Sequence, residues 1–402
     1  MPTVVFVLAV AVFAQGTSEF MVSGLLEQIA ADVGRSLGAA GLLTSLFAVG
    51  MVFGAPVMAV AAGRLPARYS VAAFLGLFCA AHVVGAVATD FTVLLVTRVV
   101  AAVANAGFLA VALAALPRLA GSAAIGRATS VVVSGVTVAC VAGVPAGTLL
   151  GQLWGWRSAF WAVAVISGAM LVPVWVLVGR AVRDGNQTGP QGISLRREWV
   201  VLGLRPVLGA VVVGVLVNAA TFAGFTYLGT ITVAVPGANA RWVPVVLALF
   251  GLGSFAGSAF TGRYSDRHGR RIVTAGTVAL VGVWLLAALT THTLIGVLIM
   301  AAAAGAVAFG VGSTLIATVV QTAAPKAPRI AGALATTAFN IGAVLGPAVA
   351  GVAVDRTAHP ATALWCSTAF AAVAVGVVLV GRRVEAAPPS APASRPQPTP
   401  GR

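Results

Sequence analysis

Long apolar runs separated by short polar stretches recur along the whole chain. Each run reaches the roughly 20 residues that a helix needs to cross the hydrocarbon core of a bilayer. The pattern therefore predicts an all-α integral membrane protein that crosses the lipid bilayer twelve times. We place the spans at residues 4–26, 39–62, 70–88, 91–115, 129–151, 159–179, 206–228, 243–262, 272–290, 294–320, 330–354 and 361–381.

Composition and charge agree with a membrane protein. Of the 402 residues, 59% are hydrophobic and 8% are charged, whereas soluble proteins carry about 25% charged residues. A net charge of +15 could indicate nucleic-acid binding. With the first residue in the cytoplasm, however, 19 Lys and Arg fall in inner loops and the tail, 4 fall in outer loops, and Arg98 is left inside a span. Cytoplasmic loops carry such an excess, so we predict a cell-membrane protein with both termini cytoplasmic and no nucleic-acid partner.

The sequence offers no pattern for a metal or cofactor. Cys79, Cys140 and Cys366 each fall within a predicted span, and their spacing matches neither a disulfide framework nor a metal site. We assign all three to packing, because free cysteine behaves as a small hydrophobic residue, and we assign His82 to packing in the third span. No phosphate-binding loop is visible, so we expect no enzymatic activity and no use of nucleotide energy.

A repeated pattern indicates two related halves. Phe47-x-x-Gly50-x-x-x-Gly54 recurs as Phe250-x-x-Gly253-x-x-x-Gly257, an offset of 257 − 54 = 203 residues. The longest polar connector lies between the sixth and seventh spans, and parallel halves around a midplane site are a known transporter architecture. We therefore predict two pseudo-symmetric six-helix bundles. Their bounds are residues 1–179 and 206–381, with a cytoplasmic linker at 180–205 and a disordered cytoplasmic tail at 382–402.

Glu19 is the one carboxylate placed inside a predicted span, among nine acidic residues. An ionisable group at membrane depth is costly and by default marks a substrate or proton pathway. Helical spacing puts Gln15, Glu19 and Ser23 on one face. The alternative is a structural glutamate near the lipid headgroups. We expect Glu19 to take part in proton and substrate binding.

Arg98 lies in the fourth span at a depth similar to that of Glu19. At 1.5 Å per residue, each lies roughly 10 Å below the outer end of its helix. Burial favours the protonated carboxylic acid, whereas a nearby guanidinium favours the carboxylate, so relative movement of the two helices could switch Glu19 between proton capture and release. The alternative is an arginine that extends to the outer membrane surface. We predict that Glu19 and Arg98 couple transport to protons.

Three amides and two aromatic rings suggest a binding cavity. Asn105, Asn218 and Asn340 lie in spans four, seven and eleven, and Phe222 and Phe225 share a face with Asn218. Amides and aromatic rings around a cavity suit a neutral aromatic ligand. Alternatively, the amides tie helices together.

The segment at residues 262–271 reads GRYSDRHGRR, which fits the pattern G-x-x-x-D-R-x-G-R-R. A basic inner loop with a turn glycine would explain the arginines but not the whole pattern. The segment resembles the inner-loop signature of the major facilitator superfamily, in which the Asp and Arg groups latch neighbouring helices. The first-half loop has Gly63 where the family pattern places Asp. The resemblance implies conformational roles for Gly262, Asp266, Arg267, Gly269 and Arg270.

The fifth span contains Gly143-Val144-Pro145-Ala146-Gly147. Small residues at this spacing allow close helix packing in any membrane protein. The run also resembles the Gly-Pro motif of exporters in the superfamily, with Val144 inserted. That resemblance implies conformational roles for Gly143, Pro145 and Gly147, and favours export over import.

Together with residues 16–20 and 105–108, these motifs resemble the drug:proton antiporters of the superfamily, and within them the bacterial chloramphenicol-resistance exporters. The resemblance implies proton-coupled export of chloramphenicol or a related small neutral drug. We also expect the protein to be monomeric. Alternatives are an exporter of sugars, nucleosides or another metabolite, and a non-transporting membrane receptor. The predicted substrate-binding residues are Gln15, Glu19, Asn105, Phe108, Asn218, Phe222, Phe225 and Asn340.

Overall fold

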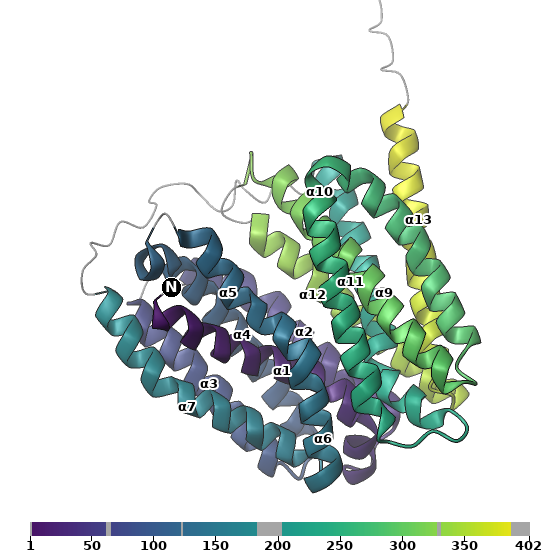
Figure 1. The fold of residues 1–402 in the computed structure, drawn as a ribbon, viewed down its shortest axis with the longest axis horizontal. Helices are drawn as coiled ribbons and strands as arrows, with labels where there is room; N and C mark the ends of the chain where they lie inside the picture. Colours follow the sequence, from purple (N-terminus) through teal and green to yellow (C-terminus); the bar gives the residue numbers. More distant parts are fainter. Residues whose placement is uncertain (1, 62–65, 122–123, 183–202, 328–330, 387–402) are drawn as a thin grey trace, which may run out of the picture.

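The computed structural model describes residues 2–61, 66–121, 124–182, 203–327 and 331–386 (Figure 1). Two groups of helices lie side by side. The first consists of α1 (Thr3–Asp32), α2 (Leu37–Ala61), α3 (Ala67–Val87), α4 (Phe91–Ala120), α5 (Ile125–Val138), the π-helical turn η2 (Ala139–Gly143), α6 (Val144–Trp154) and α7 (Arg157–Val182). The second consists of α9 (Arg205–Ala234), α10 (Trp242–Leu289), α11 (Leu294–Ala323), α12 (Ala331–Thr357) and α13 (Thr362–Ala386).

Twelve segments within the described helices are long and apolar enough to span a membrane, which confirms the predicted fold class. Helix α10 supplies two of them, and α5, η2 and α6 together supply one. The predicted linker at 180–205, the tail at 382–402 and the loop containing Gly63 lie largely outside the described residues. Helix α13 extends to Ala386, past the predicted end of the last span.

The expected loop between the eighth and ninth spans is wrong, because helix α10 continues through it. The backbone departs from helical geometry at His268, with φ −128° and ψ 17°. Four of the ten residues in this segment are arginines, and arginine is a good helix former. The segment therefore kinks at a single residue and does not unwind into a loop.

The fifth span contains a wide π-helical turn that the sequence did not reveal. Pro145 has no N–H to donate to the carbonyl four residues earlier, and its ring would collide with that carbonyl in a regular α-helix. The turn at Ala139–Gly143 ends two residues before Pro145 and gives the backbone the additional room. Such turns are frequent at functional sites.

Helix α4, which presents Arg98, begins at a defined cap. Asp90 Oδ1 accepts hydrogen bonds from the backbone N–H groups of Val93 (3.1 Å) and Thr92 (2.8 Å). These hydrogen bonds hold the pKa of Asp90 below its usual range, and the bond from Val93 contributes most. Because the cap fixes where α4 starts, it also sets the depth at which Arg98 lies.

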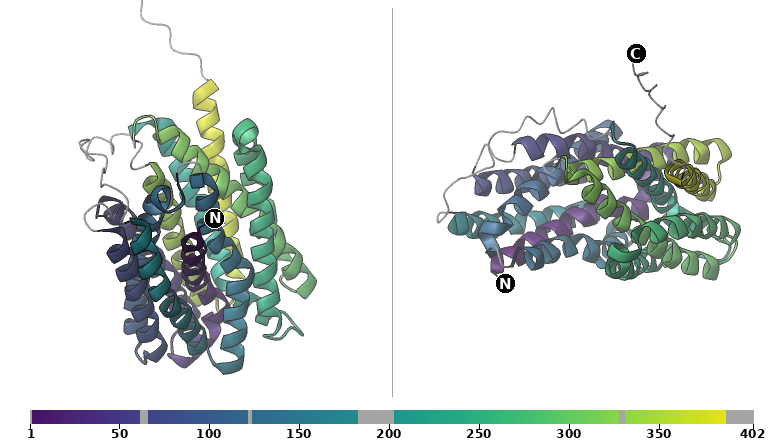
Figure 2. Two further views of the ribbon diagram at one scale, coloured as in Figure 1. Left: turned by 60° about the vertical axis from the view of Figure 1, so that its left-hand side comes forward. Right: turned by 90° about the horizontal axis from the view of Figure 1, so that it is seen from above.

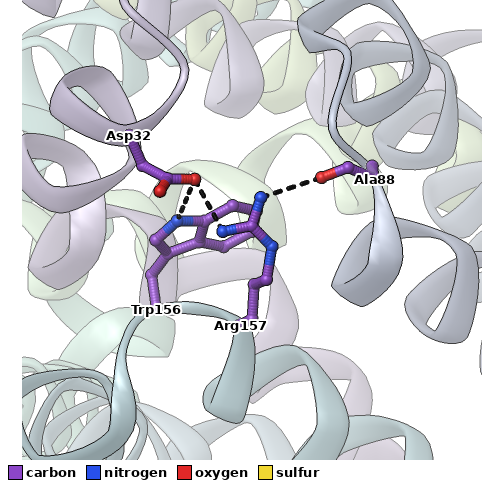
Figure 3. A network of polar contacts seen from close by, with 4 residues as sticks. All are labelled: Asp32, Ala88, Trp156 and Arg157. Carbon is purple, nitrogen blue, oxygen red and sulfur yellow. Dashed lines mark hydrogen bonds and ion pairs between the residues drawn. The ribbon is translucent and has the colours of Figure 1, made fainter.

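One ion pair fastens the end of α1 to the start of α7 (Figure 3). Arg157 Nη1 lies 2.6 Å from Asp32 Oδ2, which also accepts a hydrogen bond from Trp156 Nε1 at 3.2 Å. Arg157 Nη2 donates to the carbonyl of Ala88 at 3.0 Å, so the same guanidinium reaches the end of α3. These contacts fix three helix ends of the first half relative to one another.

The two groups of helices contact each other at one end of the bundle. We name it the distal end, because the start of α1 and the end of α13 lie towards the opposite end (Figures 1 and 2). At the distal end, Asp355 on α12 accepts hydrogen bonds from Ser36 and Gly38 at the start of α2. Ser45 of α2 also donates to the carbonyl of Val344 at 3.0 Å. The groups spread apart towards the opposite end (Figure 1).

Candidate functional site

Near Glu19, helix α1 contacts other helices of the first half on one side and a helix of the second half on the other. Ser18, on the first-half side, is fully buried, and it hydrogen-bonds to Arg98. The ring of Phe20 packs against Phe222 and Phe225 of α9, with centroids 5.9 Å apart in each case. Glu19 lies between these two contacts in the sequence, and its side chain is partly exposed. The acid therefore lies on α1 between a residue that binds the first half and a residue that packs against the second half.

Arg98 is held inside the first half, with a side chain only 1% exposed. Nη1 donates to Ser18 Oγ at 2.8 Å, Nη2 donates to the Ser18 carbonyl at 3.0 Å, and Nε donates to the Leu43 carbonyl at 3.4 Å. The guanidinium also lies over the Phe47 ring, 4.4 Å from its centroid. These contacts exclude the alternative in which Arg98 extends to the membrane surface.

Glu19 and Arg98 are neighbours but not an ion pair. They are close enough to interact electrostatically, yet within the described residues the one ion pair joins Arg157 to Asp32. Two of the guanidinium nitrogens bind Ser18, the residue before Glu19. The structure thus brings Glu19 and Arg98 to one level, and binds the arginine to the hydroxyl and carbonyl of Ser18 and not to the carboxylate of Glu19.

His82 belongs to this cluster, which the sequence interpretation missed. Its Nε2 lies 2.6 Å from Ser18 Oγ and its Nδ1 lies 2.7 Å from the Phe78 carbonyl. The ring is 2% exposed and packs against Phe78 and Phe160. An ionisable residue within a span is a signal of function by default, and that signal was available in the sequence.

Five phenylalanines from both halves surround a small apolar pocket. The rings that line it are those of Phe20 of α1, Phe222 and Phe225 of α9, Phe250 of α10 and Phe309 of α11. Cys140, in the π-helical turn, and Thr221 complete the lining. The pocket has a volume of only about 10 Å³, enough for one water molecule. A drug-sized ligand needs roughly 300 Å³ or more, so the pocket in this conformation is too small for one.

The other predicted binding residues lie outside this pocket. Asn218 donates to the Phe339 carbonyl at 2.5 Å, which ties α9 to α12, and Asn340 donates to the Thr336 carbonyl of its own helix at 2.9 Å. Asn105 approaches the sulfur of Met51 at 3.7 Å.

Phe108 is fully buried in the apolar core of the first half. Gln15 is 1% exposed, and neither atom of its amide has a hydrogen-bond partner within the described residues.

The glycines of the fifth span lie against α1. A Cβ on Gly143 would overlap Thr17 Oγ1 and lie 3.1 Å from the Phe13 ring. A Cβ on Gly147 would lie 3.5 Å from that of Met21, an ordinary contact distance. Pro145 is buried between them. Close approach to the helix that bears Glu19 therefore depends on Gly143 far more than on Gly147.

The signature segment at residues 262–271 surrounds the kink in α10. Gly262, Arg267, Gly269 and Arg270 all lie in this helix, and the side chain of Asp266 is outside what the structure describes. The Arg270 carbonyl accepts a hydrogen bond from Arg382 of α13 at 3.4 Å. A cavity of about 580 Å³ lies here between α9, α10, α11 and α13, away from the aromatic pocket. The latch role of Asp266 stays a prediction.

The described residues contain no group of three or more His, Cys, Asp or Glu side chains that could hold a metal ion. The three cysteines are free. The candidate site is accordingly built from one acid, one buried cation with its polar partners, and a ring of aromatic side chains.

Comparison with known proteins decides the family. The model of the Major Facilitator Superfamily matches residues 8–332 and 234–401. The chain belongs to the major facilitator superfamily. It is 46% identical over 387 residues to the chloramphenicol resistance protein of Streptomyces lividans, covering 96% of this chain and 97% of that one. It is 29% identical over 352 residues to the inner membrane transport protein YdhP of Escherichia coli K12, covering 87% and 88%.

Solved structures show the same fold. A bacterial homolog of the human lysosomal transporter Spinster, in an inward-facing unoccupied conformation, has a TM-score of 0.76 at 16% identity and covers 95% of this chain and 96% of that one. The nucleoside transporter NupG has a TM-score of 0.75 at 13% identity, covering 96% and 99%. The predicted family resemblance is confirmed, and this major facilitator protein is a multi-pass membrane transporter.

Proposed function

We propose that this transporter exports chloramphenicol or a related small neutral drug in exchange for protons. The observation that carries the proposal is the position of Glu19, between the Arg98 cluster of the first half and the aromatic rings of the second. A partly exposed acid at this junction can exchange a proton and also sense a ligand that separates the rings. The relative named as a chloramphenicol resistance protein supports the choice of drug.

The proton part of the proposal follows from the surroundings of Glu19. An apolar environment favours the protonated acid, and a nearby guanidinium favours the carboxylate. Arg98 is fixed on Ser18, close to Glu19 but not paired with it. A small movement of α1 against α4 is therefore enough to change which form of Glu19 is favoured. Asp266 and the glycines of the fifth span would govern that movement between conformations.

The driving force is large enough for useful export. Exchange of one proton for a neutral drug carries one positive charge inward, so the membrane potential contributes about 2.3 kcal/mol per 100 mV. Each pH unit contributes about 1.4 kcal/mol. With both gradients at these values, the limiting drug ratio across the membrane is on the order of several hundredfold.

The substrate part rests on the aromatic pocket and on Gln15. Phe20, Phe222 and Phe225 offer faces and edges to a nitrophenyl-like ring, which prefers offset or edge-to-face packing. A buried amide without a partner costs about 1–3 kcal/mol, so Gln15 is suited to bind a polar group of the ligand. An apolar pocket also favours a weakly hydroxylated drug over a sugar.

The conformation fits a transporter that is closed at its distal end. Asp355, Ser36 and Gly38 join the halves there, and the helices spread apart towards the end where the chain begins. If both termini are cytoplasmic, as we propose, this is an inward-facing state that receives drug from the cytoplasm. Export then requires the distal contacts to open.

A susceptibility panel in an efflux-deficient bacterial host tests the proposal. We expect that expression of this transporter raises the concentration of chloramphenicol that the host tolerates. Tolerance of toxic sugar analogues and of toxic nucleoside analogues should not change. Proteoliposomes with an imposed pH gradient then test coupling, and chloramphenicol should accumulate only while the gradient lasts. Accumulation of a nucleoside analogue in its place would assign the protein to metabolite export.

A further inference from the structure

A hydrogen-bonded chain runs from Arg98 through Ser18 to His82. Ser18 Oγ lies 2.8 Å from Arg98 Nη1 and 2.6 Å from His82 Nε2, and all three side chains are at most 2% exposed. We infer that His82 is a positioning residue that acts as a neutral acceptor, orients the Ser18 hydroxyl, and thereby fixes Arg98 beside the proton-coupling acid. This inference rests on the proposed proton-coupled transport.

The partners determine where each hydrogen lies. The Phe78 carbonyl can only accept, so His82 Nδ1, 2.7 Å away, carries a hydrogen and donates it. In the neutral ring Nε2 is then an acceptor, and it receives the hydroxyl hydrogen of Ser18. Ser18 Oγ in turn accepts from Arg98 Nη1. In this series of hydrogen bonds each donor has one acceptor: Arg98 donates to Ser18, Ser18 donates to His82, and His82 donates to the Phe78 carbonyl.

A protonated His82 does not fit this arrangement. Its Nε2–H would have to donate to Ser18 Oγ, which already accepts from Arg98. The hydroxyl hydrogen of Ser18 would lose its acceptor, and a second cation would share a buried site with Arg98. Burying an unpaired charge is far more costly than burying a neutral ring. His82 therefore serves as the neutral end of the chain and not as a proton carrier.

The consequence for transport passes through Ser18. Two of the three hydrogen bonds of Arg98 end on Ser18, one on its hydroxyl and one on its carbonyl. Without an acceptor at residue 82 the hydroxyl is free to turn, and its lone pairs no longer face Arg98 in one fixed direction. The guanidinium then shifts relative to Glu19, the next residue on α1, and the balance between the acid and the carboxylate changes.

Two substitutions separate hydrogen bonding from packing. His82→Phe keeps a ring that can pack against Phe78 and Phe160, at centroid distances of 4.2 and 5.9 Å, but has no acceptor. His82→Gln places an amide oxygen where it can accept from Ser18. We expect His82→Phe to lower gradient-driven accumulation of chloramphenicol on the order of tenfold, because the Ser18 hydroxyl that accepts from Arg98 loses the hydrogen bond that orients it. His82→Gln should restore coupling to within roughly threefold of the wild type.

The readout must distinguish coupling from folding. Drug exchange between equal concentrations on the two sides, without a pH gradient, should stay near the wild-type rate in both variants. A His82→Phe protein that inserts normally and still accumulates drug as the wild type does would overturn the inference. If the wild type itself shows no gradient-driven accumulation, the proposed function fails, and a second measurement still tests the role of His82.

That second measurement is ¹⁵N NMR of the histidine rings in the intact protein. The chain has four histidines, and His82→Gln identifies the signal of His82. The titratable groups around it are Arg98 on α4 and Glu19 beside Ser18 on α1, while α7 contributes the Phe160 ring. We expect a neutral ring with the hydrogen on Nδ1 between about pH 5 and 8, the range in which an ordinary histidine titrates. Ser18→Ala should move the Nε2 signal, and an imidazolium signal for His82 in this range would overturn the inference.

Discussion

Asp355 on α12 caps the start of α2, although the two helices belong to different halves. Its Oδ2 accepts from the Ser36 hydroxyl at 2.7 Å, and its Oδ1 accepts from the backbone N–H of Gly38 at 2.9 Å. A carboxylate at a helix N-terminus also interacts favourably with the helix dipole. Gly351 and Gly38 meet next to this contact, where a Cβ on Gly351 would lie 3.0 Å from the Gly38 carbonyl. The cap thus holds the distal ends of two halves that must separate for an outward opening.

Asp355→Asn should shift the transporter towards the outward-open state. The neutral amide can accept at one atom only and loses its attraction to the dipole of α2. Spin labels on the distal ends of α2 and α12 would report this shift as a larger population of long distances. Ser36→Ala removes one of the two bonds and should give an intermediate distribution. An unchanged distribution in Asp355→Asn would show that packing alone closes the distal end.

Glu19→Gln should abolish coupling while preserving insertion. Glutamine has the size of glutamate but cannot exchange a proton, so chloramphenicol should equilibrate without accumulating in proteoliposomes, and drug-triggered proton release should vanish. Glu27→Gln is the matched control, because Glu27 is an exposed carboxylate on the same helix. Uphill transport by Glu19→Gln with normal proton release would exclude Glu19 as the coupling acid.

Gly143→Leu should stop transport. The new side chain would collide with Thr17 and Phe13 of α1, and overpacking of this kind costs about 1–3 kcal/mol even where the neighbours can adjust. We expect at least a tenfold loss of export at equal membrane levels, which corresponds to about 1.4 kcal/mol. Gly282→Leu on α10 is the control, since a Cβ there meets nothing within 4 Å. Equal loss in both variants would point to a general effect of added bulk.

Phe225→Ala should weaken binding of chloramphenicol. The ring of Phe225 packs against Phe20, Phe222 and Phe250, with centroid distances of 5.9, 6.2 and 4.7 Å. Loss of aromatic packing with a ligand is worth about 0.5–1.5 kcal/mol beyond the buried area, so the KM for drug should rise about tenfold with a smaller change in the maximal rate. Phe260→Ala provides the control, because that ring is 66% exposed on the surface of the helix bundle. A normal KM in Phe225→Ala would move the drug site elsewhere.

The sequence by itself determined the membrane-spanning character, the number of spans and the family. These properties depend on signals that are local in the chain: the length of apolar runs, the isolated Glu19, and the pattern of residues 262–271. The depth of Arg98 in the membrane was also accessible, since depth along a helix follows from its fixed rise per residue. The local patterns were less informative about irregular backbone, and neither the π-helical turn before Pro145 nor the helical path around His268 was foreseen.

Only the tertiary structure decided which polar groups meet. Ser18 joins residues 64 and 80 positions away, and Asp355 reaches a helix more than 300 residues earlier in the chain. The rotation of each helix about its axis selects these partners, and packing between helices sets that rotation. For example, Gly143 lets α1 approach the fifth span closely, and Asn218 is turned towards α12. A periodic pattern identifies the residues that share a face, but it does not specify which neighbouring helix that face meets. For this reason the sequence did not show that Ser18 binds both Arg98 and His82. Nor did it show that the amides expected around a cavity instead bind helix backbone or a methionine sulfur.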